Sequence, residues 1–263
     1  MKSVAKALAM IEELASSPRA LSAIQLGRQL KVPRPTIYRL LQTLARHGFI
    51  VREDGMACYR LSFKLLDLGH RVLERTDLLE AARPILRDLS ARFRETVHLA
   101  VEEDGRMVYL DKVEGSAPFC THSRPGRRVP MHCTALGKAA LAYLPAERVR
   151  AILGRHGLQG HTARTILSYA GMVEELESVR RRGYALDDVE FEEGVRCVGA
   201  PVLDHRGVPM AAISVSAPVS RMSKAQARRT GKILCAAVAG VSGAMGWQVP
   251  GRRSRAGSVS RVT

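Results

Sequence analysis

Hydroxyl, thiol and carboxylate side chains stand at regular positions in the second half of the sequence, where they could bind a small polar ligand. Ser214 and Ser216 are two residues apart, so on a strand both side chains point to one face. Asp187 and Cys197 lie in two earlier stretches that also have the pattern of strands. Each of these groups, taken alone, could equally be a structural polar residue with its hydrogen bonds satisfied inside the fold.

A helix that we expect from about Thr134 to Tyr143 offers a second binding feature. The free backbone N–H groups and the positive dipole end of a helix start suit a carboxylate or another anion. An ordinary helix start capped by Thr134 is the simpler interpretation of the same residues. Gly137-Lys138 does not form a phosphate-binding loop, because the glycine five positions earlier is absent and Ala139 stands where Ser or Thr is needed.

Catalysis by a thiol is one alternative use of these residues. A cysteine beside an imidazole is an activated nucleophile, and Cys197 could in principle pair with His98, His132 or His205. Nothing in the sequence fixes their proximity. The stretch 194–198 is typical of a buried strand rather than of a nucleophile turn, so we expect no catalytic residues.

Zinc binding is another alternative, through Cys120, His122, His132 and Cys133. The spacing is poor, because adjacent His132 and Cys133 would diverge on a strand and the Cys-x-His pair lacks the usual gap of about two to four residues. We therefore expect no metal and no cofactor, while a metal or thiol sensor and an enzyme with a Cys/His site stay open as alternatives. The five cysteines are scattered and odd in number, which indicates reduced thiols rather than a disulfide framework.

Residues 34–46 combine a helical apolar stripe with a polar face suited to DNA. The stripe is formed by Ile37, Leu40, Leu41 and Leu44. The opposite face carries arginine, glutamine, threonine and tyrosine, which can contact base edges and phosphates in the major groove. A protein–protein module with a solvated polar face would show a similar pattern. We expect DNA contacts at Arg34, Pro35, Thr36, Tyr38, Arg39, Gln42, Thr43 and Arg46.

Two shorter helices precede this one and help to position its polar face. An apolar stripe from Val4 to Leu14 predicts the first helix. Ser22 can cap a short second helix over Ala23–Leu30, and the third helix stops near Gly48. The result is a helix, a short turn and a helix.

A hairpin follows the third helix. Residues 49–52 and 57–61 are predicted strands around an Asp-Gly turn, so residues 1–62 have the pattern of a winged helix-turn-helix. Arg52 and Arg60 on this wing are placed to contact phosphates.

The remainder of the chain alternates helices and strands. Apolar residues over 63–93 predict a helical connector, of which 63–79 would form a linker that also supports dimerisation. An antiparallel sheet with flanking helices over 80–248 is the expected result, and the whole chain is then an α+β protein. We predict strands near 97–101, 108–110, 184–189, 195–203 and 210–217, and helices over 134–143, 172–182 and 224–245.

The positive charge of the chain is concentrated near its two ends. A net charge of +16 attracts polyanions, and residues 1–75 hold 13 basic side chains against 6 acidic ones. The basic segment 249–263 has no apolar periodicity, and we expect it to be a disordered tail. The sequence contains neither a run of about 18 apolar residues nor a signal-peptide core, so we expect a cytoplasmic protein that does not enter a membrane.

A series of short motifs runs through both predicted domains. In the first they are Ser3-Val4-x-x-Ala7-Leu8 and Leu30-x-Val32-Pro33-Arg34-Pro35-Thr36-Ile37-Tyr38-Arg39-Leu40-Leu41. In the second they include Glu95-Thr96-Val97-His98-Leu99, Leu110-Asp111-Lys112-Val113, Arg124-Pro125-Gly126-Arg127-Arg128-Val129-Pro130, His132-Cys133-Thr134-Ala135-Leu136-Gly137-Lys138 and Gly194-Val195-Arg196-Cys197-Val198. In this order they resemble the IclR (isocitrate lyase regulator) family of bacterial transcription regulators over roughly residues 3–245. Arg34-Pro35 stands where many relatives carry Lys-Ser, which puts the base preference in doubt, and Gly199 stands where the family usually has Ala.

The resemblance implies a function as well as a fold. A GAF-like effector domain would control a winged helix that binds double-stranded DNA at a near-palindromic operator, in a homodimer or homotetramer. The implied effector site consists of the backbone amides of Ala135 and Leu136 with the side chains of Asp187, Cys197, Ser214 and Ser216. A small organic acid fits this set, with its carboxylate at the amides, its other oxygens at the hydroxyls, Asp187 facing a hydroxyl or a water, and Cys197 as a weakly polar wall.

Overall fold

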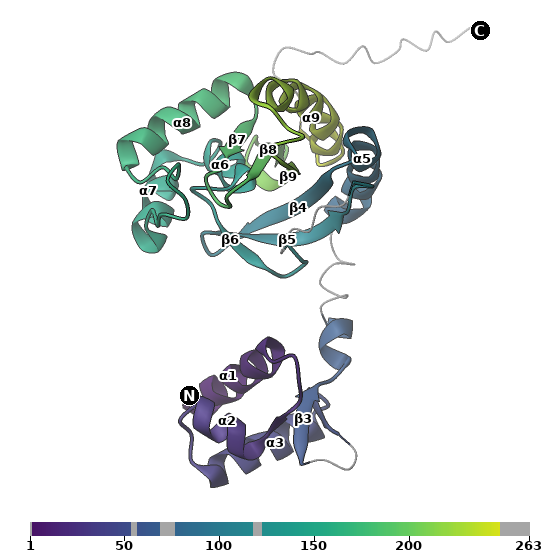
Figure 1. Cartoon of the computed structure of the whole chain (residues 1–263), viewed down its shortest axis with the longest axis vertical. Coiled ribbons are helices and arrows are strands. Elements are labelled where there is room, and N and C mark those ends of the chain that lie inside the picture. The colour runs from purple at the N-terminus through teal and green to yellow at the C-terminus, as the bar shows by residue number, and fades with distance from the viewer. Residues whose placement is uncertain (1, 54–56, 69–76, 118–122, 248–263) are drawn as a thin grey trace, which may run out of the picture. The chain divides into compact units, whose positions relative to one another are not determined.

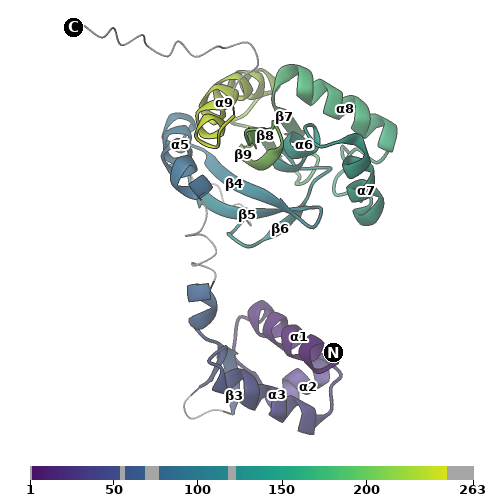
Figure 2. The same ribbon diagram turned by 180° about the vertical axis from the view of Figure 1, so that it is seen from behind.

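A computed structural model describes residues 2–53, 57–68, 77–117 and 123–247. Contacts between residues divide the chain into two compact units, Met1–Thr76 and Asp77–Thr263. Figures 1 and 2 show each unit from two opposite sides.

In the first unit, helices pack against a small antiparallel sheet. The side chains buried between the helices and the sheet include Met10, Leu26, Ile37, Leu41 and Ile50. The strands have the order β1-β3-β2, so the predicted hairpin β2–β3 is joined by a short strand that lies just before α2. The elements are α1 (Lys2–Ser16), β1 (Leu21–Ser22), α2 (Ala23–Gln29), α3 (Arg34–Arg46), β2 (Ile50–Arg52) and β3 (Cys58–Leu61).

Local sequence explains how α3 is reached. Ser22 and Gln25 form a capping box at the start of α2: the Ser22 hydroxyl accepts from the Gln25 N–H (3.3 Å), and the Gln25 side chain accepts from the Ser22 N–H (2.8 Å). Lys31 then takes a left-handed backbone conformation with φ 52° and reverses the chain. Pro33 stands at the cap position of α3, where a missing N–H costs little.

The second unit is built on one antiparallel sheet. Its strands have the order β6-β5-β4-β9-β8-β7, so β9 lies between β4 and β8 near the middle. They are β4 (Thr96–Glu103), β5 (Arg106–Val113), β6 (Arg128–Pro130), β7 (Ala185–Asp188), β8 (Val195–Leu203) and β9 (Pro209–Pro218).

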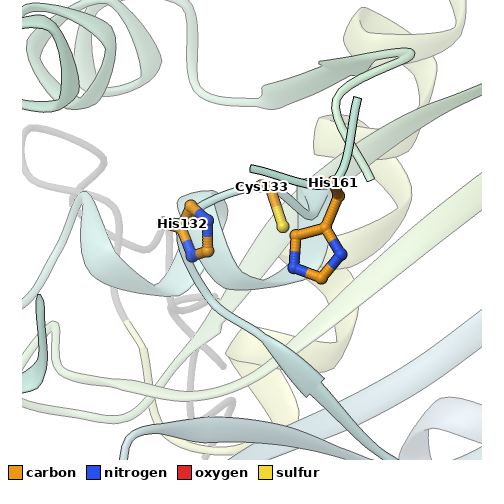
Figure 3. Close-up of side chains that lie close together, drawn as sticks. All are labelled: His132, Cys133 and His161. Carbon is orange, nitrogen blue, oxygen red and sulfur yellow. The ribbon is translucent and has the colours of Figure 1, made fainter. Parts of the chain in front are cut away.

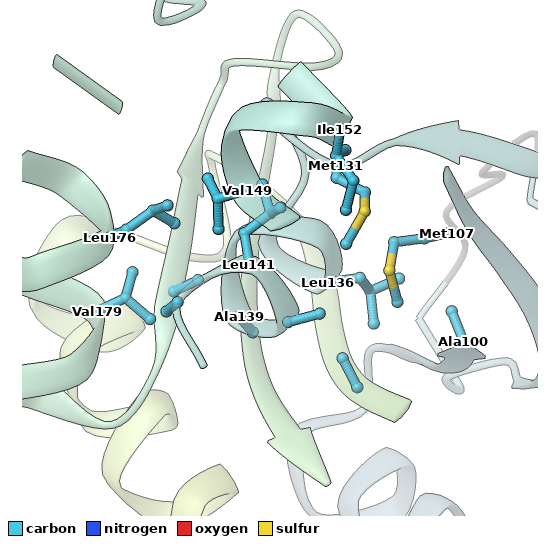
Figure 4. Packing of buried hydrophobic residues seen from close by; sticks show 14 of the residues in the cluster. Ala100, Met107, Met131, Leu136, Ala139, Leu141, Val149, Ile152, Leu176 and Val179 are labelled. Atoms are coloured by element: carbon cyan, nitrogen blue, oxygen red, sulfur yellow. The ribbon is translucent and has the colours of Figure 1, made fainter. Parts of the chain in front are cut away.

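Helices cover both faces of this sheet. On one face α5 and α9 lie side by side, and on the other α6 packs against β8 and β9 with α8 beside it. The buried core between the sheet and α6–α8 includes Met107, Leu136, Leu141, Ile152 and Val179 (Figure 4). The helices are α5 (Asp77–Phe93), α6 (Ala135–Leu141), α7 (Ala146–His156), α8 (Tyr169–Arg182) and α9 (Lys224–Ala244).

The structure confirms the α+β class, and its helices and strands lie within a few residues of those predicted, except that of the helical connector predicted over 63–93 the element α5 covers only Asp77–Phe93. It adds α7, β1 and β6, which the sequence pattern does not predict. The wing turn at 54–56, the connector over 69–76 and the predicted tail at 249–263 lie outside the described residues. Among the described residues, Cys58, Cys133, Cys197 and Cys235 are free thiols, and Cys120 lies outside these ranges. Among the helices of the described ranges, none combines the length and the apolar character needed to span a membrane.

Candidate functional site

In the first unit, α3 presents a continuous polar face to solvent. Its inner stripe buries Ile37, Leu41 and Leu44 against the core. Arg34, Arg39 and other predicted contact residues are exposed, with Thr36 half-buried. No Asp or Glu occurs between Arg34 and Arg46, so this face has no acidic side chain of its own to repel phosphates. The exposed members of the predicted set are Arg34, Pro35, Tyr38, Arg39, Gln42, Thr43 and Arg46.

Two details refine the predicted roles on this unit. The Thr43 hydroxyl donates to the Arg39 backbone carbonyl (2.9 Å), so its proton is already used inside the helix. On the wing, Val51 pairs with Arg60 and Arg52 pairs with Tyr59, which places Arg52 and Arg60 on opposite faces of the hairpin. Both are exposed, and Arg60 lies 3.7 Å from the Glu53 carboxylate. The two arginine side chains therefore leave the hairpin in opposite directions.

In the second unit, strand register gathers the predicted ligand-binding residues on one face of the sheet. Asp187 is opposite Cys197, and Cys197 is opposite Ser216. Ser214 is opposite Gly199 on the same strand pair. Residues directly opposite each other project to the same face. Asp187, Cys197, Ser214 and Ser216 thus form one polar patch, in which all but the half-buried Cys197 are buried.

The first turn of α6 sits directly on this patch. A side-chain carbon at Gly199 would lie 2.5 Å from the carbonyl oxygen of Ala135 and 3.0 Å from the backbone nitrogen of Leu136, so only glycine allows this approach. Thr134 caps the helix by accepting from the Gly137 N–H (3.2 Å). Because Ser214 is the neighbour of Gly199 across β8 and β9, the Ala135 and Leu136 backbone lies next to the hydroxyls.

His98 belongs to the same patch, although the sequence pattern assigned it no ligand-binding role. It is opposite Ser214 on the neighbouring strand. Its Nδ1 lies 3.4 Å from the Ser216 hydroxyl oxygen, and its Nε2 lies 2.7 Å from that of Ser123. Burial, together with the nearby Lys112 ammonium, lowers the pKa of His98 to about 3. The imidazole is therefore neutral at pH 7 and relays hydrogen bonds rather than charge. The position of the His98 ring depends on its contact with Ser123 in the loop between β5 and β6, and no local sequence pattern predicts this contact.

Asp187 closes a tight turn at the edge of the patch. Its carboxylate accepts from the backbone N–H groups of Glu190 (2.7 Å) and Phe191 (3.3 Å). Burial raises the pKa of Asp187 to about 7, against the lowering effect of the Glu190 N–H. Burial at this position therefore disfavours the ionised form of the Asp187 carboxyl group, and the two backbone N–H groups offset part of that effect.

The geometry does not support a thiol nucleophile at Cys197. Burial and the nearby Asp187 carboxylate raise the pKa of this thiol well above its ordinary value. His98 is close by through Ser216, but its two nitrogens face the hydroxyl groups of Ser216 and Ser123, where a carboxylate would be needed to orient the imidazole as a base. His205 lies in the turn after β8, at the opposite end of that strand from Cys197.

The structure groups possible zinc ligands differently from the four residues considered in the sequence. Cys120 and His122 fall outside the described residues. The expectation that His132 and Cys133 diverge on a strand is wrong, because residues 131–134 form bends between β6 and α6. Both side chains instead contribute to a cluster with His161, from the loop between α7 and α8.

The chain is similar to known proteins over both units. The sequence matches the model of the IclR helix-turn-helix domain over residues 3–54 and that of the bacterial transcriptional regulator IclR C-terminal domain over residues 70–243. It is 34% identical to the HTH-type transcriptional regulator KdgR of Escherichia coli, over 94% of each chain. It is 33% identical to the transcriptional repressor IclR of the same organism, over 94% of this chain and 90% of the repressor. The crystal structure of the Thermotoga maritima IclR superposes with a TM-score of 0.81 at 30% identity, over 94% of this chain and all of that one.

Proposed function

The chain belongs to the IclR family of bacterial transcriptional regulators, and on that basis we propose that it binds a near-palindromic operator through α3 and the wing under the control of a small organic acid. The DNA-binding domain of the family corresponds to the first unit and the effector-binding domain to the second. The observation that carries the proposal is the uninterrupted basic and polar face of α3. A regulator of bacterial genes works where the chromosome is, so we place the protein in the cytoplasm.

Arg39 is our main candidate for a base contact. It is exposed in the middle of the polar face, and a guanidinium can bind guanine O6 and N7 together. We expect Arg39→Ala to weaken binding to the operator by about 1–3 kcal/mol and to change the preferred base at one position of each half-site. Fluorescence anisotropy with the operator and with single-base variants measures both effects.

The matched control is Arg19→Ala, which removes the same charge from an exposed position outside α3. In this proposal the same major groove is also contacted by Arg34, Thr36, Tyr38 and Gln42. The wing residues Arg52 and Arg60 contact two different phosphates. A loss for Arg39→Ala that is uniform across sequences would make Arg39 a phosphate contact. A loss no greater than that of Arg19→Ala would remove it from the interface.

We propose a homodimer as the DNA-binding species, since a near-palindrome requires two recognition helices related by symmetry. Exposed apolar side chains of the first unit favour a partner copy: Phe63 is 78% exposed and Leu66 is 68% exposed. We expect Leu66→Glu to shift sedimentation at micromolar concentration toward the monomer and to weaken operator binding. Leu167→Glu, an equally drastic change at an exposed leucine of the second unit, should do neither. A wild-type protein that sediments as a monomer contradicts this assignment.

For the effector we propose a small organic acid on the patch beside α6. Its carboxylate would lie at the Ala135 and Leu136 amides, and its keto or hydroxy oxygens at Ser214 and Ser216. Asp187 would face a hydroxyl group or a water, because an ionised carboxylate there repels another, and Cys197 would form a weakly polar wall. The support is the register that brings these groups together and the buried hydroxyls among them.

Removal of both hydroxyls tests this site. The double variant Ser214→Ala, Ser216→Ala is expected to bind the acid about 1–3 kcal/mol more weakly, because ligand oxygens lose their partners. Calorimetry with a panel of metabolic acids compares it with the wild type and with Ser220→Ala, an exposed hydroxyl just beyond β9. Operator binding without acid should survive in all three. An acid that binds the double variant as tightly as the wild type, or binding of uncharged ligands only, would contradict the placement.

A further inference from the structure

We propose that His132, Cys133 and His161 form a zinc site with three protein ligands, beside the start of α6 and with no ligand from the patch of Ser214 and Ser216. The ligand atoms of the three side chains all lie within 4.8 Å of one another. Figure 3 shows the Cys133 sulfur between the two imidazole rings, with all three side chains turned toward a common point. His132 and Cys133 precede α6, whereas His161 comes from a distant loop, so the cluster is produced by tertiary structure.

The donor set selects the metal. Two imidazoles with one thiolate are ligands of zinc, and the set lacks the carboxylate oxygens that calcium or magnesium prefers. With Zn–N bonds of about 2.0–2.1 Å and Zn–S bonds of about 2.3 Å, the two nitrogens and the sulfur of a tetrahedral site lie roughly 3.3–3.6 Å apart. The ligand atoms of the three side chains, at most 4.8 Å apart, must close to this spacing when zinc binds, and His161 is the one exposed side chain of the three. On binding, a Zn–S bond replaces the S–H bond of Cys133, and the proton passes to water.

A hydrogen bond from one ring nitrogen of His132 leaves the other ring nitrogen available to bind a metal. Its Nε2 lies 2.9 Å from the backbone carbonyl oxygen of Gln159. A carbonyl oxygen only accepts, so Nε2 carries the proton and Nδ1 is left with a free lone pair. Zinc-bound histidines typically donate their second ring nitrogen to a carbonyl or carboxylate in this way, which fixes the tautomer and the ring orientation.

The loop that carries His161 is held in place without a metal. The His161 backbone N–H donates to the Thr165 hydroxyl (3.0 Å), which in turn donates to the Glu190 carbonyl (2.7 Å). Thr162 donates to the Val189 carbonyl (2.6 Å). The His161 ring also lies 5.2 Å from the ring of Phe191, centroid to centroid. Three ligands on an anchored framework lose little conformational freedom when they bind zinc.

The fourth position of a tetrahedral zinc would open into an adjacent cavity. This cavity has a volume of about 230 Å³, and both His132 and His161 line it together with Arg106 and Arg128. Structural zinc sites have four protein ligands, whereas sites with three keep a position for an exchangeable ligand. Beside two arginines, that ligand is a water or a small anion.

Equilibrium dialysis of the full chain against zinc chloride, with metal content read by mass spectrometry, tests the site. We expect one zinc per chain in the wild type. His161→Ala and Cys133→Ser should each lose affinity by more than the roughly 10–100-fold that follows loss of a mere supporting partner. Cobalt(II) should show a thiolate charge-transfer band in the wild type that Cys133→Ser lacks. His161 is exposed, so His161→Ala keeps the test valid even if a change at buried Cys133 prevents folding.

Two controls separate this site from general binding to thiols and imidazoles. His156 lines the same cavity but is outside the cluster, and Cys235 is a free thiol on α9. His156→Ala and Cys235→Ser should bind zinc as the wild type does. The proposal is overturned if the wild type takes up no zinc at micromolar concentration, if His161→Ala keeps full affinity, or if His156→Ala loses as much as His161→Ala.

Discussion

Lys138→Ala is expected to destabilise the second unit by about 3–5 kcal/mol, the cost of leaving a buried charge without its partner. Lys138 is fully buried in α6. Its ammonium group lies 2.5 Å from the Glu190 carboxylate and 3.3 Å from that of Glu175. The second carboxylate oxygen of Glu190 is buried and has no hydrogen-bond partner, so Glu190 depends on Lys138. Burial raises the pKa of Glu190 against the opposing effect of the ammonium.

Urea unfolding followed by the fluorescence of Trp247 measures this effect. Trp247 is the single tryptophan of the chain, and its ring packs against Gly207 in the second unit. The matched control is Lys224→Ala, which removes an exposed pair with Asp188 (3.1 Å) and should cost at most about 1 kcal/mol. Lys138→Met combined with Glu190→Gln should cost less than Lys138→Ala, because no uncompensated charge remains with that pair. Equal midpoints for Lys138→Ala and Lys224→Ala would contradict this account of the ion pair.

Gly199→Ala is expected to cost about 3 kcal/mol, at the upper end of the range for overpacking, and to abolish effector binding. The added carbon would lie 2.5 Å from the Ala135 carbonyl oxygen, and a backbone group cannot turn aside as a side chain can. The first turn of α6 must therefore move away from β8, which separates the Ala135 and Leu136 amides from Ser214. Trp247 fluorescence in urea gives the stability, and calorimetry with the acid gives the binding.

Gly154→Ala is the control for this change. Gly154 lies within α7, and a carbon added there meets nothing within 4 Å. Since Ala is preferred to Gly inside a helix by about 1 kcal/mol, this variant should be as stable as the wild type or slightly more so, with effector binding intact. If Gly199→Ala behaved like Gly154→Ala, the close contact between α6 and β8 would not be what positions the site.

The exposed polar face of α3 and the polar patch of the second unit could both be predicted from the periodicity of the sequence. The α3 stripe has helical spacing, and its buried residues are among those predicted. Ser214 and Ser216 are on one face because strand residues alternate. The antiparallel sheet and flanking helices were likewise predicted, whereas α7 was not, since its buried face consists only of Val149, Ile152 and Leu153 among charged residues.

What the sequence could not predict depends on contacts between distant segments. A lysine is expected at the surface, yet every residue of α6 is buried, so Lys138 needs partners from α8 and from the turn after β7. His98 forms a hydrogen bond with Ser123, which lies in the loop between β5 and β6. His161 joins His132 and Cys133 only because hydrogen bonds hold its loop to residues 189 and 190. None of these contacts leaves a local pattern.

The central claim is that α3 reads a specific operator, and selection from a random duplex library tests it most directly. The intact chain is mixed with the library at one fixed salt concentration, because phosphate contacts alone give affinity that varies with salt but not with sequence. Sequencing of the bound fraction is expected to show an enriched near-palindrome, with half-sites about one helical turn apart or a multiple of it. Arg39→Ala should lose or alter that motif at one base of each half-site. A bound fraction with no motif beyond the input, for a protein that still binds DNA, would contradict the account.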